Sequence, residues 1–193
     1  MKLKDLLQFG RPAFVAALIS IATLPVAAQQ LTGTYGYTGT STCFISPTGF
    51  NDDLTPVSGQ GITIRTGTAY GTYTFKDNGT GTVQFHEARV SALGEEYGGG
   101  SSDDGTTTFT FTMGTEGAFT SKVQSVKWTM LTGPYAGKKG TTVGIPEATG
   151  QIAKNGSVVL TTLSPGVEKA LNPSGVTVET SICLRTDVLF PIE

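Results

Sequence analysis

Cysteine, histidine and tryptophan are scarce in this chain of 193 residues, which contains two cysteines, one histidine and one tryptophan. Metal sites and activated nucleophiles in proteins draw mainly on histidine, cysteine and carboxylates at set spacings. The one histidine, His86, has no serine or cysteine nucleophile at a spacing that would pair with it. We therefore predict neither a metal site nor a cofactor, and the sequence leaves open whether the protein is an enzyme.

Charged residues are also few, at 15% of the chain, and the formal net charge at pH 7 is −2. Proteins that bind nucleic acids present clusters of lysine and arginine to the phosphate backbone. Beyond the adjacent pair Lys138 and Lys139 the mature chain has no such cluster. We therefore predict no nucleic-acid partner.

Only one long apolar run occurs, at residues 12–26, and its roughly 15 residues fall short of the roughly 20 that a membrane-spanning helix needs. Basic residues precede the run, and small residues follow it up to Ala28. This arrangement is typical of a secretory signal peptide. We predict that residues 1–28 are the signal peptide and residues 29–193 a single domain. The mature protein is then periplasmic or extracellular and does not span a membrane.

Alternation of apolar and polar residues dominates the mature chain, and helical periodicity is nearly absent. Residues 175–190 and 106–113 alternate most regularly, which is typical of half-buried β-strands. Asn78-Gly79 and Asn155-Gly156 each separate two such runs and predict tight hairpins, whose strands are antiparallel neighbours.

The whole pattern predicts an all-β fold, a single antiparallel up-and-down barrel of about 8–10 strands. A two-sheet β-sandwich with Greek-key connections is the alternative. We expect a break around Pro146, a flexible acidic loop at residues 94–105, and one helical turn at residues 165–171.

The two cysteines lie in the first and last predicted strands. Cys43 is in residues 33–45 and Cys183 in residues 175–190, so each is the other's only possible partner. Disulfides persist in exported proteins, which agrees with the predicted signal peptide. A bond closing a loop of about 140 residues would contribute about 4 to 5 kcal/mol on the chain-entropy account. It would place the first and last strands side by side and close the barrel.

The two faces of the last strand pose a conflict. One face is aliphatic, while the face of Cys183 also carries Glu179, Arg185 and Asp187. We expect the disulfide to lie outside a barrel filled with apolar side chains, because the interiors of small barrels are usually filled in this way. The alternative is a polar interior with the aliphatic face outside, which would favour oligomers.

Aromatic residues are the remaining candidates for a site. In a closed barrel they are a natural lining for an apolar pocket, so we predict a small apolar ligand. The predicted wall residues are Tyr35, Tyr37, Phe109, Phe111 and Trp128. Two alternatives stay open: a structural or interaction protein of the cell envelope without a pocket, and an isomerase- or cyclase-type enzyme. The enzyme would need His86, Glu179 and Arg185 to converge.

Gly33-Thr34-Tyr35 on the first strand, the strand meander and Arg185 near the end together resemble the lipocalin and calycin type of small secreted barrel. The resemblance implies a ligand-binding barrel in which a basic residue of the last strand packs across the aromatic ring of the first. Here those residues would be Arg185 and Tyr35. The runs at residues 77–82 and 182–185 also resemble uncharacterised exported bacterial proteins.

Overall fold

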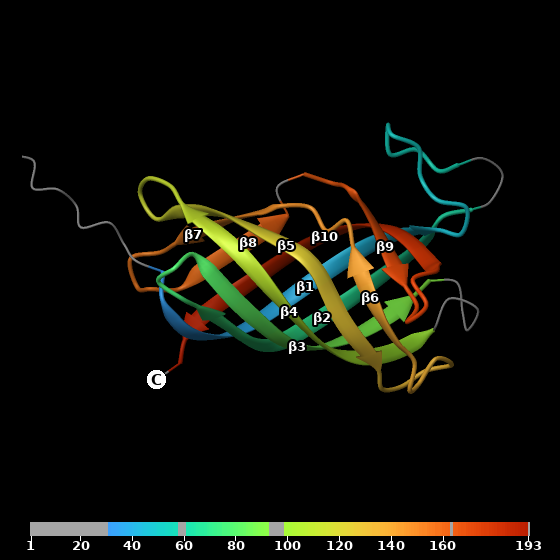
Figure 1. Cartoon of the computed structure of the whole chain (residues 1–193), viewed down its shortest axis with the longest axis horizontal. Coiled ribbons are helices and arrows are strands. Elements are labelled where there is room, and N and C mark those ends of the chain that lie inside the picture. Colours follow the sequence, from blue (N-terminus) through green and yellow to red (C-terminus); the bar gives the residue numbers. More distant parts are fainter. Residues whose placement is uncertain (1–30, 58–60, 93–98, 163, 193) are drawn as a thin grey trace, which may run out of the picture.

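The fold is known from a computed structural model, which describes residues 31–57, 61–92, 99–162 and 164–192 (Figure 1). These residues contain ten β-strands and no helix, and all the strands belong to one antiparallel sheet. The predicted signal peptide lies outside the described residues. The strands are β1 (Gly33–Ser46), β2 (Thr63–Phe75), β3 (Thr80–Ser91), β4 (Gly100–Met113), β5 (Ala118–Met130), β6 (Lys139–Val143), β7 (Ala148–Ile152), β8 (Val158–Thr162), β9 (Val167–Leu171) and β10 (Thr177–Pro191).

The sheet closes on itself because β1 pairs with β2 on one side and with β10 on the other. The β1–β10 register runs from Tyr35 opposite Pro191 to Ser46 opposite Thr180. Strands β1 to β6 follow one another around the ring, and Figure 1 shows tilted strands wrapped around a common axis. The fold is barrel-like, and the predicted antiparallel meander of about 8–10 strands is confirmed.

The ten strands fill eight positions around the ring. Strands β6 and β7 share the position after β5, and β9 and β8 share the position before β10. The first half of β5 pairs with β7 and its second half with β6. In the same way β10 pairs with β9 and then with β8. Residues 144–147 separate β6 from β7, and they include Gly144 at a φ of 76° and Pro146. Proline cannot donate to the ladder, so the predicted break at Pro146 is confirmed.

Glycines and aromatic residues face each other across the strands. A Cβ atom built on Gly105 would lie 2.1 Å from Cζ of Phe85, and one on Gly140 would lie 2.2 Å from Cζ2 of Trp128. Each ring therefore lies flat against the backbone of the opposite strand, where only glycine leaves room. The same relationship holds for Gly81 with Phe109 and Gly150 with Phe119.

The interior has an aromatic half and a polar half. The aromatic half lies towards the end of the molecule at which residues 76–79, 114–117 and 153–157 connect the strands. The polar half lies towards the opposite end, where the disulfide is found. Buried members of the aromatic half are Leu31, Tyr35, Tyr37, Tyr73, Phe75, Val83, Phe109, Phe111, Phe119, Ile152, Val158, Leu160 and Leu189.

The Cys43–Cys183 disulfide is present and buried, in contact with Ile45 inside the ring. Our expectation that it lies outside an apolar-filled barrel is wrong. The face of β10 that carries Cys183 also carries charged residues, and these turn inward because they find partners on other strands. The aliphatic face is consequently outside, and Val178, Leu184 and Val188 are exposed. The oligomers that such a face would favour stay a prediction.

Two local predictions are also wrong. Residues 167–171, where we expected a helical turn, form strand β9, which pairs with both β6 and β10. Of the loop expected at residues 94–105, residues 100–105 are instead the first part of β4 and pair with β3, while residues 94–98 lie outside the described residues. In both segments, hydrogen bonding to neighbouring strands outweighs the local composition.

Candidate functional site

Four of the five predicted wall residues lie together in the aromatic half. The ring of Phe75 is central, with centroids 5.5 Å from Tyr35, 5.2 Å from Phe109 and 5.3 Å from Phe111. These contacts are edge-to-face, the arrangement that aromatic pairs favour. Trp128 is not part of this group. The rings contact one another directly, and their role in binding an apolar ligand stays a prediction.

The polar half is held together by ion pairs between strands far apart in the sequence. Arg65 of β2 binds the carboxylate of Glu179 of β10 with two hydrogen bonds, of 2.7 and 2.6 Å. Arg185 of β10 makes the same two-pronged contact with Glu168 of β9, which is almost fully buried. These pairs account for the inward orientation of the charged face of β10.

A second group of acids lies beside them on β3, β4 and β10. Glu87 accepts a hydrogen bond of 2.9 Å from Ser41, and the fully buried Asp103 contacts Arg89. Asp187 accepts a hydrogen bond of 2.7 Å from the hydroxyl of Tyr73. Burial raises the pKa of Asp187 above its ordinary value, although the bond from Tyr73 acts in the opposite direction.

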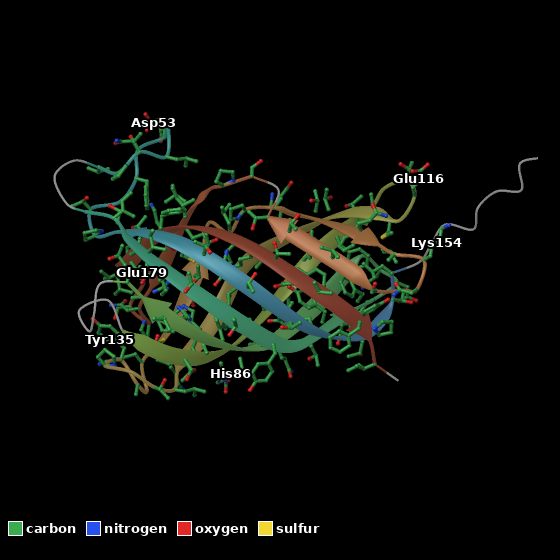
Figure 2. All side chains as sticks on the ribbon, turned by 180° about the vertical axis from the view of Figure 1, so that it is seen from behind. Asp53, His86, Glu116, Tyr135, Lys154 and Glu179 are labelled. Atoms are coloured by element: carbon green, nitrogen blue, oxygen red, sulfur yellow. A yellow bond between two sulfur atoms is a disulfide. The ribbon has the colours of Figure 1, made fainter. Side chains whose placement is uncertain are left out.

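The structure does not bring together His86, Glu179 and Arg185, the three residues that the enzyme alternative requires. Glu179 and Arg185 face inward, each in its own ion pair, whereas His86 faces outward, as Figure 2 shows. Among the described residues, no group of three or more histidines, cysteines or carboxylates is placed to hold a metal ion. Arg185 is opposite Ser41 in β1, and Tyr35 is opposite Pro191. The resemblance to lipocalins implies that Arg185 packs across the ring of Tyr35, but that ring contacts Phe75.

An open hollow of about 900 Å³ lies on the outer surface and crosses five strands, from β2 to β6. Two cross-strand rows of outward side chains line it, and we call it the cross-strand groove. One row is Tyr70, His86, Asp104, Thr129 and Lys139. The other row is Thr72, Gln84, Thr106, Lys127 and Thr141.

Between these rows lies a third row, whose side chains point inward. It consists of alternating glycines and aromatic residues, Gly71, Phe85, Gly105, Trp128 and Gly140. The floor of the groove is thus the backbone of the glycine–aromatic pairs described above. Glycines inside strands often mark bends or places where a ligand approaches the backbone.

The two ends of the groove differ in chemistry. At the β2–β3 end the rings of Tyr70 and His86 are 5.2 Å apart, and Tyr70 is 61% exposed. His86 Nδ1 is 2.8 Å from Asp104 Oδ1, which fixes the orientation of the imidazole. At the β5–β6 end the charged groups are the ammonium groups of Lys127 and Lys139, both exposed. The groove therefore offers a ring platform at one end and positive charge at the other.

Only Trp128 of the predicted wall residues lines this groove. The sequence did place His86 on the face opposite Glu87, and the structure agrees. A signal for the groove was present in the Asn78-Gly79 hairpin, since its register places Tyr70 opposite His86. The β5–β6 end of the groove could not be found in this way, because a bulge between Thr107 and Phe109 shifts the register of β4 and β5.

A smaller hollow of about 480 Å³ lies over β4, β5, β7 and β8 near the other end of the molecule. Its lining includes Met113, Phe119 and Val159. None of the described segments forms a helix that could cross a lipid bilayer.

Fold and site together define a class of molecule: an all-β, disulfide-closed, barrel-like domain with an open groove across its outer surface. No protein-family model matches the chain, and none of the curated proteins matches it. The lipocalin-like character of the chain stays a prediction.

Proposed function

We propose that this is an exported binding protein, and that the cross-strand groove binds a polar ligand with at least one flat face. The observation that carries the proposal is the composition of the groove wall. Ten outward side chains from five strands line one hollow of about 900 Å³ together with Pro173, and all ten are polar or aromatic. Small-molecule sites are commonly hollows of this volume with mainly apolar walls, so a wall of polar and aromatic side chains favours a ligand that is itself polar.

The chemistry of the wall supports a polar ligand. An exposed aromatic ring such as Tyr70 provides a flat apolar surface with a polar tip. Hydroxyl and amide groups of Thr72, Gln84 and Thr106 follow beside it and can both donate and accept hydrogen bonds. A flat ligand would stack on the ring and satisfy these groups in place of water.

The scaffold supports a binding role because the groove stands on paired strands rather than on loops. Sites on regular elements hold their geometry more precisely, which lowers the ordering cost of binding. The ring is closed by the β1–β10 pairing and cross-linked at Cys43 and Cys183.

Export is part of the proposal. It is supported by the basic, apolar and small-residue order at residues 1–28 and by the disulfide, which persists in oxidising compartments. Cell fractionation, followed by N-terminal sequencing of the recovered protein, tests it. We expect the mature chain to begin at Gln29 and to be recovered outside the cytoplasm. Recovery of the full-length chain in the cytoplasm would overturn it.

A small apolar ligand remains a second candidate, supported by the aromatic cluster around Phe75. The lipocalin-like resemblance supports the same ligand class. In this case the rings of Tyr35, Phe109 and Phe111 would have to separate to admit the ligand.

The test is a ligand screen on the mature, oxidised protein, read by thermal shift and by the fluorescence of Trp128, the only tryptophan. The panel contains saccharides, nucleotides, amino acids and fatty acids. A ligand at a hundred times its Kd stabilises a protein by about 2.7 kcal/mol. We expect a polar ligand to stabilise the protein and Tyr70→Ala to abolish the shift, while Lys122→Gln, on β5 outside the groove, preserves it. A response to fatty acids alone, unaffected by Tyr70→Ala, would favour the second candidate.

A further inference from the structure

We infer that the ligand of the cross-strand groove is an acidic oligosaccharide lying across the strands, with a sugar ring on Tyr70 and a carboxylate at Lys127 and Lys139. The inference rests on the proposed function and adds the chemical class and the direction of the ligand. It rests on the difference between the two ends of the groove, a ring platform at one end and two ammonium groups at the other.

The length of the groove calls for an extended ligand. Its two rows cross five strands, and neighbouring strands are about 4.8 Å apart, so the rows extend over roughly 19 Å. A single small molecule would contact only one end of such a site. A chain of sugar rings can contact both ends while presenting hydroxyl groups along the whole length.

The ring platform suits a sugar. Sugar rings have faces made of C–H groups, which pack on aromatic rings, and edges made of hydroxyl groups. Tyr70 is 61% exposed and faces His86 at 5.2 Å, so one side of the platform is already supported. Since Nδ1 of His86 is engaged by Asp104, the other ring nitrogen is left for a ligand hydroxyl.

The middle of the groove suits a polyol. Gln84, Thr106 and Thr129 stand opposite one another or diagonally on β3, β4 and β5. Their side chains combine donors and acceptors without a fixed charge, which matches the hydroxyl groups of a saccharide. Asp104 can accept from hydroxyl groups, and its charge disfavours a carboxylate at the platform end.

The cationic end selects an acid. Lys127 and Lys139 belong to adjacent strands, β5 and β6, and lie in the two different rows. A ligand carboxylate between the rows can reach both ammonium groups, and a hydrogen bond between two charged groups is about twice as strong as one between neutral groups. Two lysines are too few for a nucleic acid, whose binding requires many phosphate contacts. An oligosaccharide with a uronic acid at one end provides this carboxylate and leaves a neutral ring for the platform at Tyr70.

The test compares three tetrasaccharides on the mature protein: a cello-oligosaccharide with one terminal glucuronic acid, the methyl ester of that acid, and neutral cellotetraose. Binding is measured by calorimetry and by Trp128 fluorescence at low and at physiological salt. We expect the acid to bind most tightly and to weaken with salt, because exposed charges are screened. Tyr70→Ala should weaken all saccharides, whereas Lys127→Gln with Lys139→Gln should weaken only the acid, by about tenfold. Lys122→Gln is the matched control and should change nothing.

The outcomes separate this inference from the proposed function. If the acid and its ester bind equally, or if the lysine variant binds the acid as well as the parent does, the acidic class is wrong while a saccharide groove stands. If no probe binds, the inference is wrong, and the ligand screen alone then decides the proposed function. Binding that is unchanged by Tyr70→Ala would contradict both the inference and the proposed function, because the ligand would then lie outside the groove.

Discussion

Cys43 and Cys183 lie directly opposite each other in the register of β1 and β10, with their Cα atoms 4.1 Å apart and their sulfurs bonded. The bond connects residues 140 positions apart in the sequence and cross-links the two strands whose pairing closes the ring. It therefore restrains the unfolded chain over residues 43–183.

Removing the disulfide should lower the free energy of unfolding by about 2 to 5 kcal/mol, because the unfolded chain regains the entropy of the open loop. The variant is Cys43→Ser with Cys183→Ser, measured by urea unfolding against the oxidised parent. Reductant should destabilise the parent and leave the variant unchanged. Equal midpoints for parent and variant would show that the β1–β10 pairing alone holds the ring.

Breaking the pair of Arg185 and Glu168 should destabilise the fold. Glu168→Gln removes the buried partner of Arg185, whose own side chain is 38% exposed, so the cost should be about 1 to 3 kcal/mol, below that of a fully buried pair. The double variant Arg185→Met with Glu168→Met should recover most of this loss. The exposed pair of Lys122 and Glu147, 3.6 Å apart, is the control, and Glu147→Gln should cost less than about 1 kcal/mol. A double variant less stable than the single one would contradict the argument.

Replacing Gly105 by alanine should cost about 1 to 3 kcal/mol, because the new Cβ would overlap the ring of Phe85. A Cβ atom added at Gly100, on the same strand, would meet nothing within 4 Å, so Gly100→Ala should be nearly neutral. Chemical unfolding of both variants gives the comparison. Adding Phe85→Leu to Gly105→Ala should relieve part of the overlap, and no relief would mean that the backbone of β4 is the constraint.

The free energy of unfolding should fall as the pH rises through the titration of Asp187. Burial raises the pKa of this carboxyl, so the folded protein binds its proton more tightly than the unfolded chain does. The contribution of this tighter proton binding to the free energy of unfolding is therefore complete below the ordinary pKa of 3.8. It is lost as the pH rises from there to the folded-state pKa. Asp187→Asn should be more stable than the parent at neutral pH, and the difference should vanish below pH 3.8. NMR titration of the carboxyl carbon measures the pKa directly, and a value below 3.8 would reverse the prediction.

Much of the strand pattern could be predicted from the sequence. Alternation located the first and last strands, the Asn78-Gly79 and Asn155-Gly156 turns set two hairpins, and two cysteines permit only one disulfide. These features are local or combinatorial, so they need no knowledge of distant contacts. Strand β9 was missed because its residues become a strand only through pairing with β6 and β10.

The candidate site was harder to predict. Of the aromatic residues expected to line a pocket, only Trp128 lines the groove, and the others pack together inside. A cross-strand row depends on the register of several strands at once, and one bulge between β4 and β5 shifts every position beyond it. Lys127 and Lys139 therefore could not be aligned with Tyr70 from spacing alone.

By itself the sequence determined the alternation of the strands, the tight turns, and the single disulfide that joins the first and last strands. Only the tertiary structure decided which face is inside. A period of two separates the side chains of a strand into two sets without saying which set is buried. The charged set of β10 is the inner one because Arg65 and Glu168, on other strands, neutralise Glu179 and Arg185 there. That choice turns the opposite set of each strand outward, including the polar side chains that form the groove.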